Sequence, residues 1–172
     1  MATSIRLSKE FQRFPKEIDF AFMYLEKEDD MSHWIIQISP TNDSPLKKDL
    51  ETCREKYGID HICLHLIFSE DYPLEAPFIY VEYPEIRVVS ESGWIMYKGV
   101  PCWELIGNGW VASYYTWTIV RQFTAMLEAS ARIELSRSTM ARVSKATADE
   151  GKAYLMRCHP EWMPKEKKKG RK

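Results

Sequence analysis

The sequence predicts an α+β protein in which helices lie at the ends of an antiparallel sheet. Two observations favour this class. Four segments of alternating apolar residues follow one another between residues 18 and 83, and helical spacing occurs before them, after them and in one insert. A doubly wound fold would alternate strands and helices throughout. The 172 residues are 45% hydrophobic and 13% aromatic, which suits a single domain with one core.

The chain should begin with a short helix. Thr3 or Ser4 can cap this helix, and Pro15 should end it. Leu7 and Phe11 keep helical spacing, so they should face the core.

Four strands should follow, joined as an antiparallel meander. Their alternating apolar positions cover residues 18–24, 34–38, 62–68 and 78–83. A polar turn at residues 27–30 joins the first two strands as a hairpin. Between the second and third strands, Ser44 can cap a short inserted helix and Gly58 can stop it.

Residues 84–115 show no periodicity. So long a stretch without regular structure in a compact domain is usually a functional loop, so the chemistry is expected there. Helical spacing returns from Ile119 to Leu127 and again from Met140 to Leu155, with Gly151 as a weak point.

The domain boundaries follow from composition. We expect a core domain at residues 1–163 and a basic flexible tail at residues 164–172. The tail is either a plain solvated terminus or a patch for nuclear localisation or for an acidic partner. The expected compartments are therefore the cytoplasm and, as a second location, the nucleus.

Charge and cysteine content narrow the classes of function. The formal net charge is −1, so nucleic acid is not an expected partner. The sequence has no apolar run long enough to span a membrane and no signal-peptide pattern, so we expect an intracellular protein without membrane contact. The four cysteines form no CxxC pair, which predicts reduced thiols, no disulfide framework and no metal site.

Cys102 is the candidate nucleophile. It follows Pro101 in the non-periodic stretch, a setting that suits a thiol displayed on a rigid loop, whereas Cys63 lies in a predicted strand. The competing interpretation is a small buried apolar side chain without reactivity. No histidine is close to Cys102 in the sequence, so the residues predict no Cys/His dyad.

Two groups of residues around Cys102 resemble those of a known family. Residues 71–77, Asp-Tyr-Pro-Leu-Glu-Ala-Pro, are similar to the Tyr-Pro-Phe-x-x-Pro turn that precedes the catalytic cysteine of ubiquitin-conjugating enzymes at a similar interval. After the cysteine those enzymes carry an acid, an aliphatic pair and a tryptophan, and the matching positions here hold Glu104, Leu105, Ile106 and Trp110. Further segments are similar to the Q-type branch of this family. They are residues 43–46 with the helix after them, residues 58–61, residues 108–110, and a terminal helix that ends near Trp162.

The resemblance implies the ubiquitin-conjugating-enzyme fold: an N-terminal helix, a four-stranded antiparallel meander, a long active-site loop and C-terminal helices. Cys102 would accept ubiquitin from the activating enzyme as a thioester and transfer it to a substrate or ligase. The implied partners are ubiquitin, the ubiquitin-activating enzyme, ubiquitin ligases and protein substrates. No bound cofactor is implied, because ATP is used by the upstream activating enzyme. The alternative is a catalytically inactive binding module on the same scaffold.

One departure concerns the His-Pro-Asn motif, whose asparagine is thought to stabilise the oxyanion in this family. The positions that align with it hold Ser-Gly-Trp, residues 92–94. Asn108, Tyr97 or backbone N–H groups of the loop are candidates for oxyanion or loop support. Glu134 falls where many relatives place an acid near the incoming lysine, and a solvated surface charge is an equal alternative.

The resemblance also implies a docking surface for the activating enzyme and for ligases. It comprises Arg6 and Lys9 of the first helix, Tyr72, Pro73 and Leu74 of one loop, and Ala112 and Ser113 of another. Leu74 replaces the usual phenylalanine, which leaves the choice of ligase open. Without the resemblance, the two basic residues would be interpreted as a solvated helix face.

Overall fold

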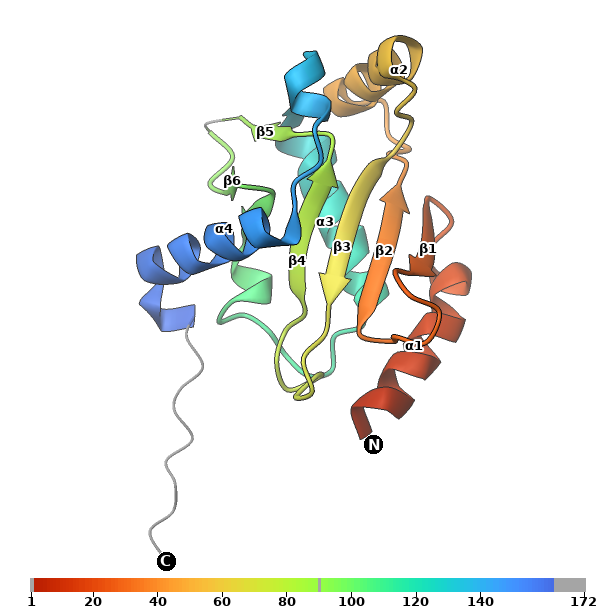
Figure 1. Ribbon diagram of the computed structural model, residues 1–172, viewed down its shortest axis with the longest axis vertical. Coiled ribbons are helices and arrows are strands. Elements are labelled where there is room, and N and C mark those ends of the chain that lie inside the picture. The colour runs from red at the N-terminus through yellow and green to blue at the C-terminus, as the bar shows by residue number, and fades with distance from the viewer. Residues whose placement is uncertain (1, 90, 163–172) are drawn as a thin grey trace, which may run out of the picture.

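A four-stranded antiparallel sheet forms the centre of the computed structural model, which describes residues 2–89 and 91–162 (Figure 1). In spatial order, the strands are β1 (Ala21–Leu25), β2 (His33–Ile38), β3 (Ile62–Ile67) and β4 (Phe78–Tyr83). The helices longer than one turn are α1 (Ala2–Glu17), α2 (Pro45–Tyr57), α3 (Thr116–Ser130) and α4 (Lys145–Cys158). The predicted α+β class, the meander and the inserted helix are confirmed.

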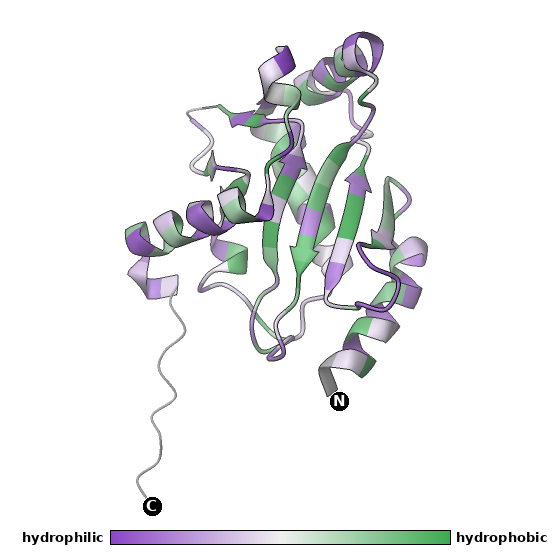
Figure 2. Cartoon of the chain, viewed as in Figure 1, coloured by the Kyte–Doolittle hydropathy of each residue, from purple (hydrophilic) through white to green (hydrophobic). Residues whose placement is uncertain are grey.

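The main core lies between one face of the sheet and helices α1 and α3. Trp34 and Ile36 of β2, Leu64 of β3, Phe14 of α1 and Phe123 of α3 are fully buried in one cluster. In Figure 2 the apolar colour is concentrated along β2, β3 and β4. Burying each such side chain contributes about 1.5–3 kcal/mol, so this face fixes the register of the sheet.

The first helix continues past Pro15, so the prediction that this proline ends it is wrong. α1 reaches Glu17, and the backbone N–H of Ile18 still donates to the Phe14 carbonyl at 3.0 Å. Phe14 and Ile18 are both buried. Their packing on the core keeps the last turn helical, although Pro15 cannot donate a backbone hydrogen bond.

The prediction that residues 84–115 form a single irregular loop is wrong, because this stretch contains short strands. These are β5 (Ile86–Val88), β6 (Ile95–Tyr97) and β7 (Val100–Cys102); β5 pairs with β8 (Ala131–Ile133), and β6 pairs with β7. Strands of three residues are too short to show alternation, which explains why the sequence pattern missed them.

The β6–β7 hairpin packs closely on α4. Lys98 and Gly99 at its turn have φ angles of 50° and 77°, as a two-residue turn with two positive φ angles requires. Gly151 lies inside α4, where an added Cβ would come within 2.8 Å of the Tyr97 carbonyl oxygen. α4 continues through this glycine, and the absence of a side chain there permits the close approach of the helix to the hairpin.

α4 begins at Lys145, later than the predicted start at Met140. Ser144 caps it, because its Oγ accepts a hydrogen bond from the Thr147 backbone N–H at 3.1 Å. The predicted basic tail at residues 164–172 lies outside the described residues. Among the described residues, no helix combines the length and apolarity needed to cross a membrane.

Candidate active site

Cys102 is the last residue of β7 and lies opposite Ile95 of β6. Its side chain is half-buried and packs beside a small apolar cluster that includes Val100 and Leu155. Val100 belongs to the same hairpin, and Leu155 belongs to α4. The thiol is therefore held by a short strand against the last long helix, and not by an irregular loop.

A histidine from the end of α4 contacts this thiol. The Sγ atom of Cys102 lies 3.3 Å from Nε2 of His159, and Nδ1 of His159 lies 3.0 Å from Oε1 of Glu161. The expectation that Cys102 has no Cys/His partner is therefore wrong. His159 comes from 57 residues further along the chain, so no local spacing in the sequence signals the contact.

The carboxylate of Glu161 fixes which nitrogen of the imidazole carries the proton. A hydrogen bond from its own backbone N–H, and then one from His159, lower the pKa of the Glu161 carboxyl, so it is ionised at neutral pH. An ionised carboxylate can only accept, so Nδ1 of His159 must donate to it. In the neutral ring Nε2 then holds the lone pair and accepts from the Cys102 thiol. The imidazole is oriented as a base for this thiol.

Burial raises the pKa of the Cys102 thiol above its ordinary value of 9.0, and Cys158 and Glu161 add to that effect. At neutral pH the group is therefore a thiol rather than a standing thiolate. A buried thiol of this kind acts as a nucleophile only with a proton acceptor beside it, and His159 occupies that position.

Trp162 packs between His159 and the segment that follows Cys102. Its ring stacks on that of His159, with centroids 4.4 Å apart and planes 12° from parallel. The indole also packs against Gly107, where an added Cβ would lie 2.6 Å from the ring. Sequence reasoning used Trp162 only as the end of the last helix and missed both contacts.

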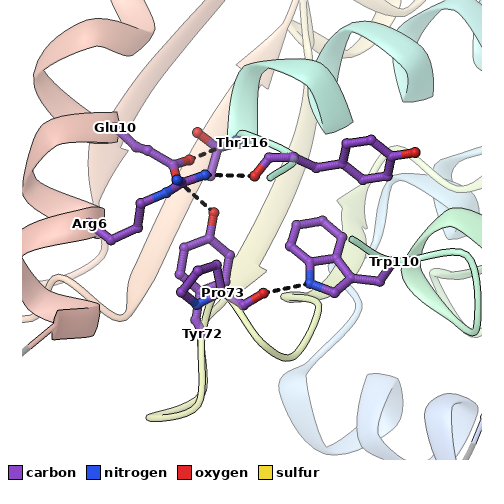
Figure 3. A network of polar contacts seen from close by, with 7 residues as sticks. Arg6, Glu10, Tyr72, Pro73, Trp110 and Thr116 are labelled. Carbon is purple, nitrogen blue, oxygen red and sulfur yellow. Dashed lines mark hydrogen bonds and ion pairs between the residues drawn. The ribbon is translucent and has the colours of Figure 1, made fainter. Parts of the chain in front are cut away.

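A buried carboxylate joins α1 to the loop at Tyr72 and to the start of α3. Glu10 is 1% exposed; it pairs with Arg6, accepts from the Tyr72 hydroxyl at 2.8 Å, and accepts from the Thr116 backbone N–H at 2.7 Å (Figure 3). Thr116 is the first residue of α3, so Glu10 caps that helix and complements the positive end of its dipole. The three segments are thus held in fixed relative positions.

A second tie joins the two loops of the predicted docking surface. The indole N–H of Trp110 donates to the Pro73 carbonyl at 2.8 Å (Figure 3). Leu74 beside it is 75% exposed. Ala112 is half-buried and Ser113 is exposed, shortly after Trp110 in the chain. The structure therefore links the predicted docking loops.

The two basic residues of the predicted docking surface differ in their surroundings. Arg6 is engaged within the protein: besides Glu10, its Nη2 donates to the Tyr114 carbonyl at 2.8 Å, and its guanidinium lies 4.2 Å from the centre of the Tyr115 ring. Lys9 is exposed. Of the two, Lys9 is the side chain open to a partner, whereas Arg6 mainly shapes the surface.

The remaining predicted site residues lie around the hairpin and further away. The ring of Tyr97 packs on Tyr154 of α4, with centroids 4.5 Å apart. Asn108 is exposed in the turn after the short 3-10 helix at Glu104–Ile106. Glu134 is exposed directly after β8, which belongs to a different two-stranded sheet from that of Cys102. Their predicted roles stay predictions.

The chain is similar in sequence to several proteins named as ubiquitin-conjugating enzymes. No protein-family model matches the chain. A Caenorhabditis elegans protein named ubiquitin-conjugating enzyme E2 25 is 29% identical over 138 residues, covering 78% of this chain and 35% of the relative. A Drosophila melanogaster protein named as Q-like among the ubiquitin-conjugating enzymes is 28% identical over 163 residues (91% and 51%), and human ubiquitin-conjugating enzyme E2 Q1 is 28% identical over 134 residues (76% and 31%). The chain thus spans between about a third and a half of the length of these relatives.

Solved structures show the same fold. A Plasmodium falciparum ubiquitin-conjugating enzyme matches with a TM-score of 0.55 at 18% identity, over 73% of this chain and 97% of that one. Human ubiquitin-conjugating enzyme E2 G1 matches with a TM-score of 0.55 at 16% identity, over 73% and 93%. The fold is that of the ubiquitin-conjugating enzymes, and the chain is a relative of that family. Within it, the Q-type names among the sequence relatives confirm the predicted Q-type branch.

Proposed function

We propose that this chain is an active ubiquitin-conjugating enzyme that carries ubiquitin as a thioester on Cys102. The observation that carries the proposal is the contact of Cys102 with an imidazole whose other nitrogen is paired with Glu161. A scaffold that only bound ubiquitin would need neither the thiol nor a base oriented toward it.

In the first step the Cys102 thiol attacks the carbonyl carbon of the thioester between ubiquitin and the activating enzyme. His159 takes the thiol proton as the new C–S bond forms. The old C–S bond then breaks, and the proton passes to the sulfur of the departing activating-enzyme cysteine. One thioester replaces another, so this step needs no ATP and no bound cofactor.

In the second step an acceptor attacks the thioester on Cys102. The acceptor is a lysine amine, a serine hydroxyl, an N-terminal amine or a ligase cysteine. His159 can take the acceptor's proton and return it to the Cys102 sulfur as the C–S bond breaks. Asn108, Tyr97 or backbone N–H groups would support the oxyanion, a contribution of about 2.7–4 kcal/mol for one donor. Glu134 would assist an incoming lysine.

Partners would dock on the surface formed by α1 and the two linked loops. Exposed apolar side chains lie on all three segments, namely Ile5, Leu74 and Val111, and Lys9 adds a positive charge beside them. Exposed apolar groups with a charged rim suit a protein interface. We place the activating enzyme and ligases there, and protein substrates at Cys102. The proposed location is the cytoplasm and the nucleus.

The test is a charging assay with activating enzyme, ATP and ubiquitin, read on gels with and without thiol reductant. Wild type should form a reductant-sensitive adduct, and Cys102→Ala should form none. Cys158→Ala is the matched control, because Cys158 is the exposed cysteine at the end of α4 and should be dispensable for charging.

The proposal fails if wild type forms no adduct with ubiquitin or with several ubiquitin-like modifiers. The inactive binding module would then be the better account. It also fails if Cys102→Ala still charges while Cys158→Ala does not.

A further inference from the structure

A second group of polar side chains lies on the face of the sheet opposite the main core. Cys63 and His65 alternate along β3 with Leu64, which faces that core, so both point to the other side. Glu82 reaches them from β4, where the pairing of the two strands is shifted by an irregularity between Cys63 and Leu64. The irregularity brings the carboxylate next to two side chains of the adjacent strand.

The three side chains converge on one point. Oε2 of Glu82 lies 3.2 Å from the Cys63 Sγ atom and 2.9 Å from the His65 Nε2 atom. All three possible ligand atoms lie within 4.8 Å of one another. Cys63 is 1% exposed, and the side chains of His65 and Glu82 are 8% and 16% exposed.

Neighbouring groups hold this cluster in place. The His65 ring stacks on Tyr80 with centroids 4.6 Å apart, which fixes the direction of Nε2. Arg142 donates to Oε1 of Glu82 at 2.9 Å, which leaves Oε2 facing Cys63 and His65. Such second contacts are what orients the ligands of a metal ion.

We propose that Cys63, His65 and Glu82 form a zinc-binding site with water as the fourth ligand. Sulfur, imidazole nitrogen and carboxylate oxygen together are the donors that Zn²⁺ prefers, and thiolate disfavours Mg²⁺ and Ca²⁺. With zinc bonds of about 2.0–2.3 Å, tetrahedral ligands lie about 3.3–3.5 Å apart, so the distances from Glu82 Oε2 to the other two ligand atoms need to widen only slightly.

The charges and protons balance in the bound state. Zinc displaces the Cys63 thiol proton to solvent, and the His65 proton moves from Nε2 to Nδ1. The two negative ligands then neutralise the ion, while Arg142 keeps its bond to the other oxygen of Glu82. The backbone carbonyl of Glu82 also accepts from the Val143 N–H at 2.8 Å, so the ion would anchor the segment that leads into α4.

The expectation of no metal site rested on the absence of CxxC spacing. Here the two ligands on one strand are separated by a single residue, and the third comes from the neighbouring strand. Such a set is assembled by strand pairing, so the sequence spacing that marks a zinc finger is not required.

The experiment is a titration of the reduced, metal-free protein with Co²⁺, followed by competition with Zn²⁺. Co²⁺ bound to a thiolate gives a charge-transfer band in the near ultraviolet. We expect one equivalent bound by wild type, displacement by Zn²⁺, and a rise in melting temperature with Zn²⁺. Cys63→Ser should weaken binding more than about 100-fold, because it removes a direct ligand, and losing only a supporting contact already costs 10–100-fold.

Cys102→Ser is the matched control, since Cys102 also lies beside a histidine and a glutamate, and it should bind Co²⁺ as wild type does. His65→Asn provides a second variant if Cys63→Ser does not fold. The proposal is overturned if folded wild type binds no Co²⁺ with a thiolate band. It is equally overturned if the band survives in Cys63→Ser and disappears in Cys102→Ser. Neither result bears on charging at Cys102, which is assayed separately.

Discussion

The chain contains two groups of cysteine, histidine and glutamate that are connected in different orders. At the hairpin the histidine stands in the middle: Cys102 contacts one nitrogen of His159, and Glu161 contacts the other. On the sheet the glutamate stands in the middle, and Cys63 and His65 both contact one oxygen of Glu82.

This difference in order separates two kinds of chemistry. A histidine between a thiol and a carboxylate is oriented to move a proton, because each ring nitrogen has one defined role. A carboxylate between a thiol and an imidazole gathers three donor atoms around one point, which favours binding an ion over moving a proton. The two arrangements therefore underlie the two proposals, a reactive thiol at the hairpin and a metal-binding group within the sheet.

The contrast between the Cys102 group and the Cys63 group can be tested first by the rate of ubiquitin transfer, where we expect the largest effect. We expect His159→Gln to lower transfer from preformed thioester to a free amine or hydroxyl acceptor by about 10²–10⁴-fold, since positioned acid–base groups contribute that much. The measurement is single-turnover discharge followed on gels.

The control for that prediction is His33→Gln. His33 also pairs with a carboxylate, that of Asp30 at 2.9 Å, but it belongs to β2 and should not affect transfer. Glu161→Gln should lower the rate less than His159→Gln and alter its pH profile, because it disturbs the ring only through Nδ1. An unchanged rate in His159→Gln would remove the histidine from the mechanism.

A second test of the contrast measures the stability of the protein instead of the rate of transfer. Glu82→Ala should lower the free energy of unfolding by about 1–3 kcal/mol for each buried group left without its partner, here the Cys63 thiol and the His65 imidazole. Glu161→Ala removes a half-exposed carboxylate and should change the free energy of unfolding by less than about 0.5 kcal/mol. Urea unfolding of the metal-free proteins measures both, and equal losses would contradict the contrast.

A third and smaller effect lies in the pH dependence of stability. Burial, and then the hydrogen bond to the Glu82 carboxylate, raise the pKa of Cys63 from 9.0 to about 12. Above pH 9 the unfolded thiol ionises while the folded one stays protonated, so its contribution is complete below pH 9 and is lost as the pH rises toward 12.

The readout for this third effect is the difference in unfolding free energy between metal-free wild type and Cys63→Ser. It should narrow from pH 9 to pH 11 by at most about 1.4 kcal/mol per pH unit. A difference that stays constant over this range would mean that Cys63 does not titrate as its surroundings require.

The sequence predicted the parts of the molecule that depend on periodicity and on local caps. Alternation located all four strands of the meander, and Ser44 and Gly58 marked both ends of α2, where Ser44 accepts from Lys47 N–H and Gly58 has a φ of 71°. These signals act within a few residues of one another, so they can be read from the chain alone.

The sequence could not predict what depends on contacts between distant segments. Pro15 did not end α1, because buried neighbours hold the last turn. His159 reaches Cys102 only through the packing of α4 on the hairpin, which the absence of a side chain at Gly151 permits. The Cys63 group needs the register of β3 against β4. In each case tertiary packing overrides or supplies what local pattern cannot.

The distance in sequence between Cys102 and His159 also has a consequence for protein synthesis. A ribosome that adds about 5–20 residues per second makes the histidine roughly 3 to 11 s after the cysteine, because 57 residues separate them. During that interval the nascent chain already contains the sheet and the thiol but not the imidazole. The pair of thiol and imidazole is therefore completed only after the strands of the sheet have been made.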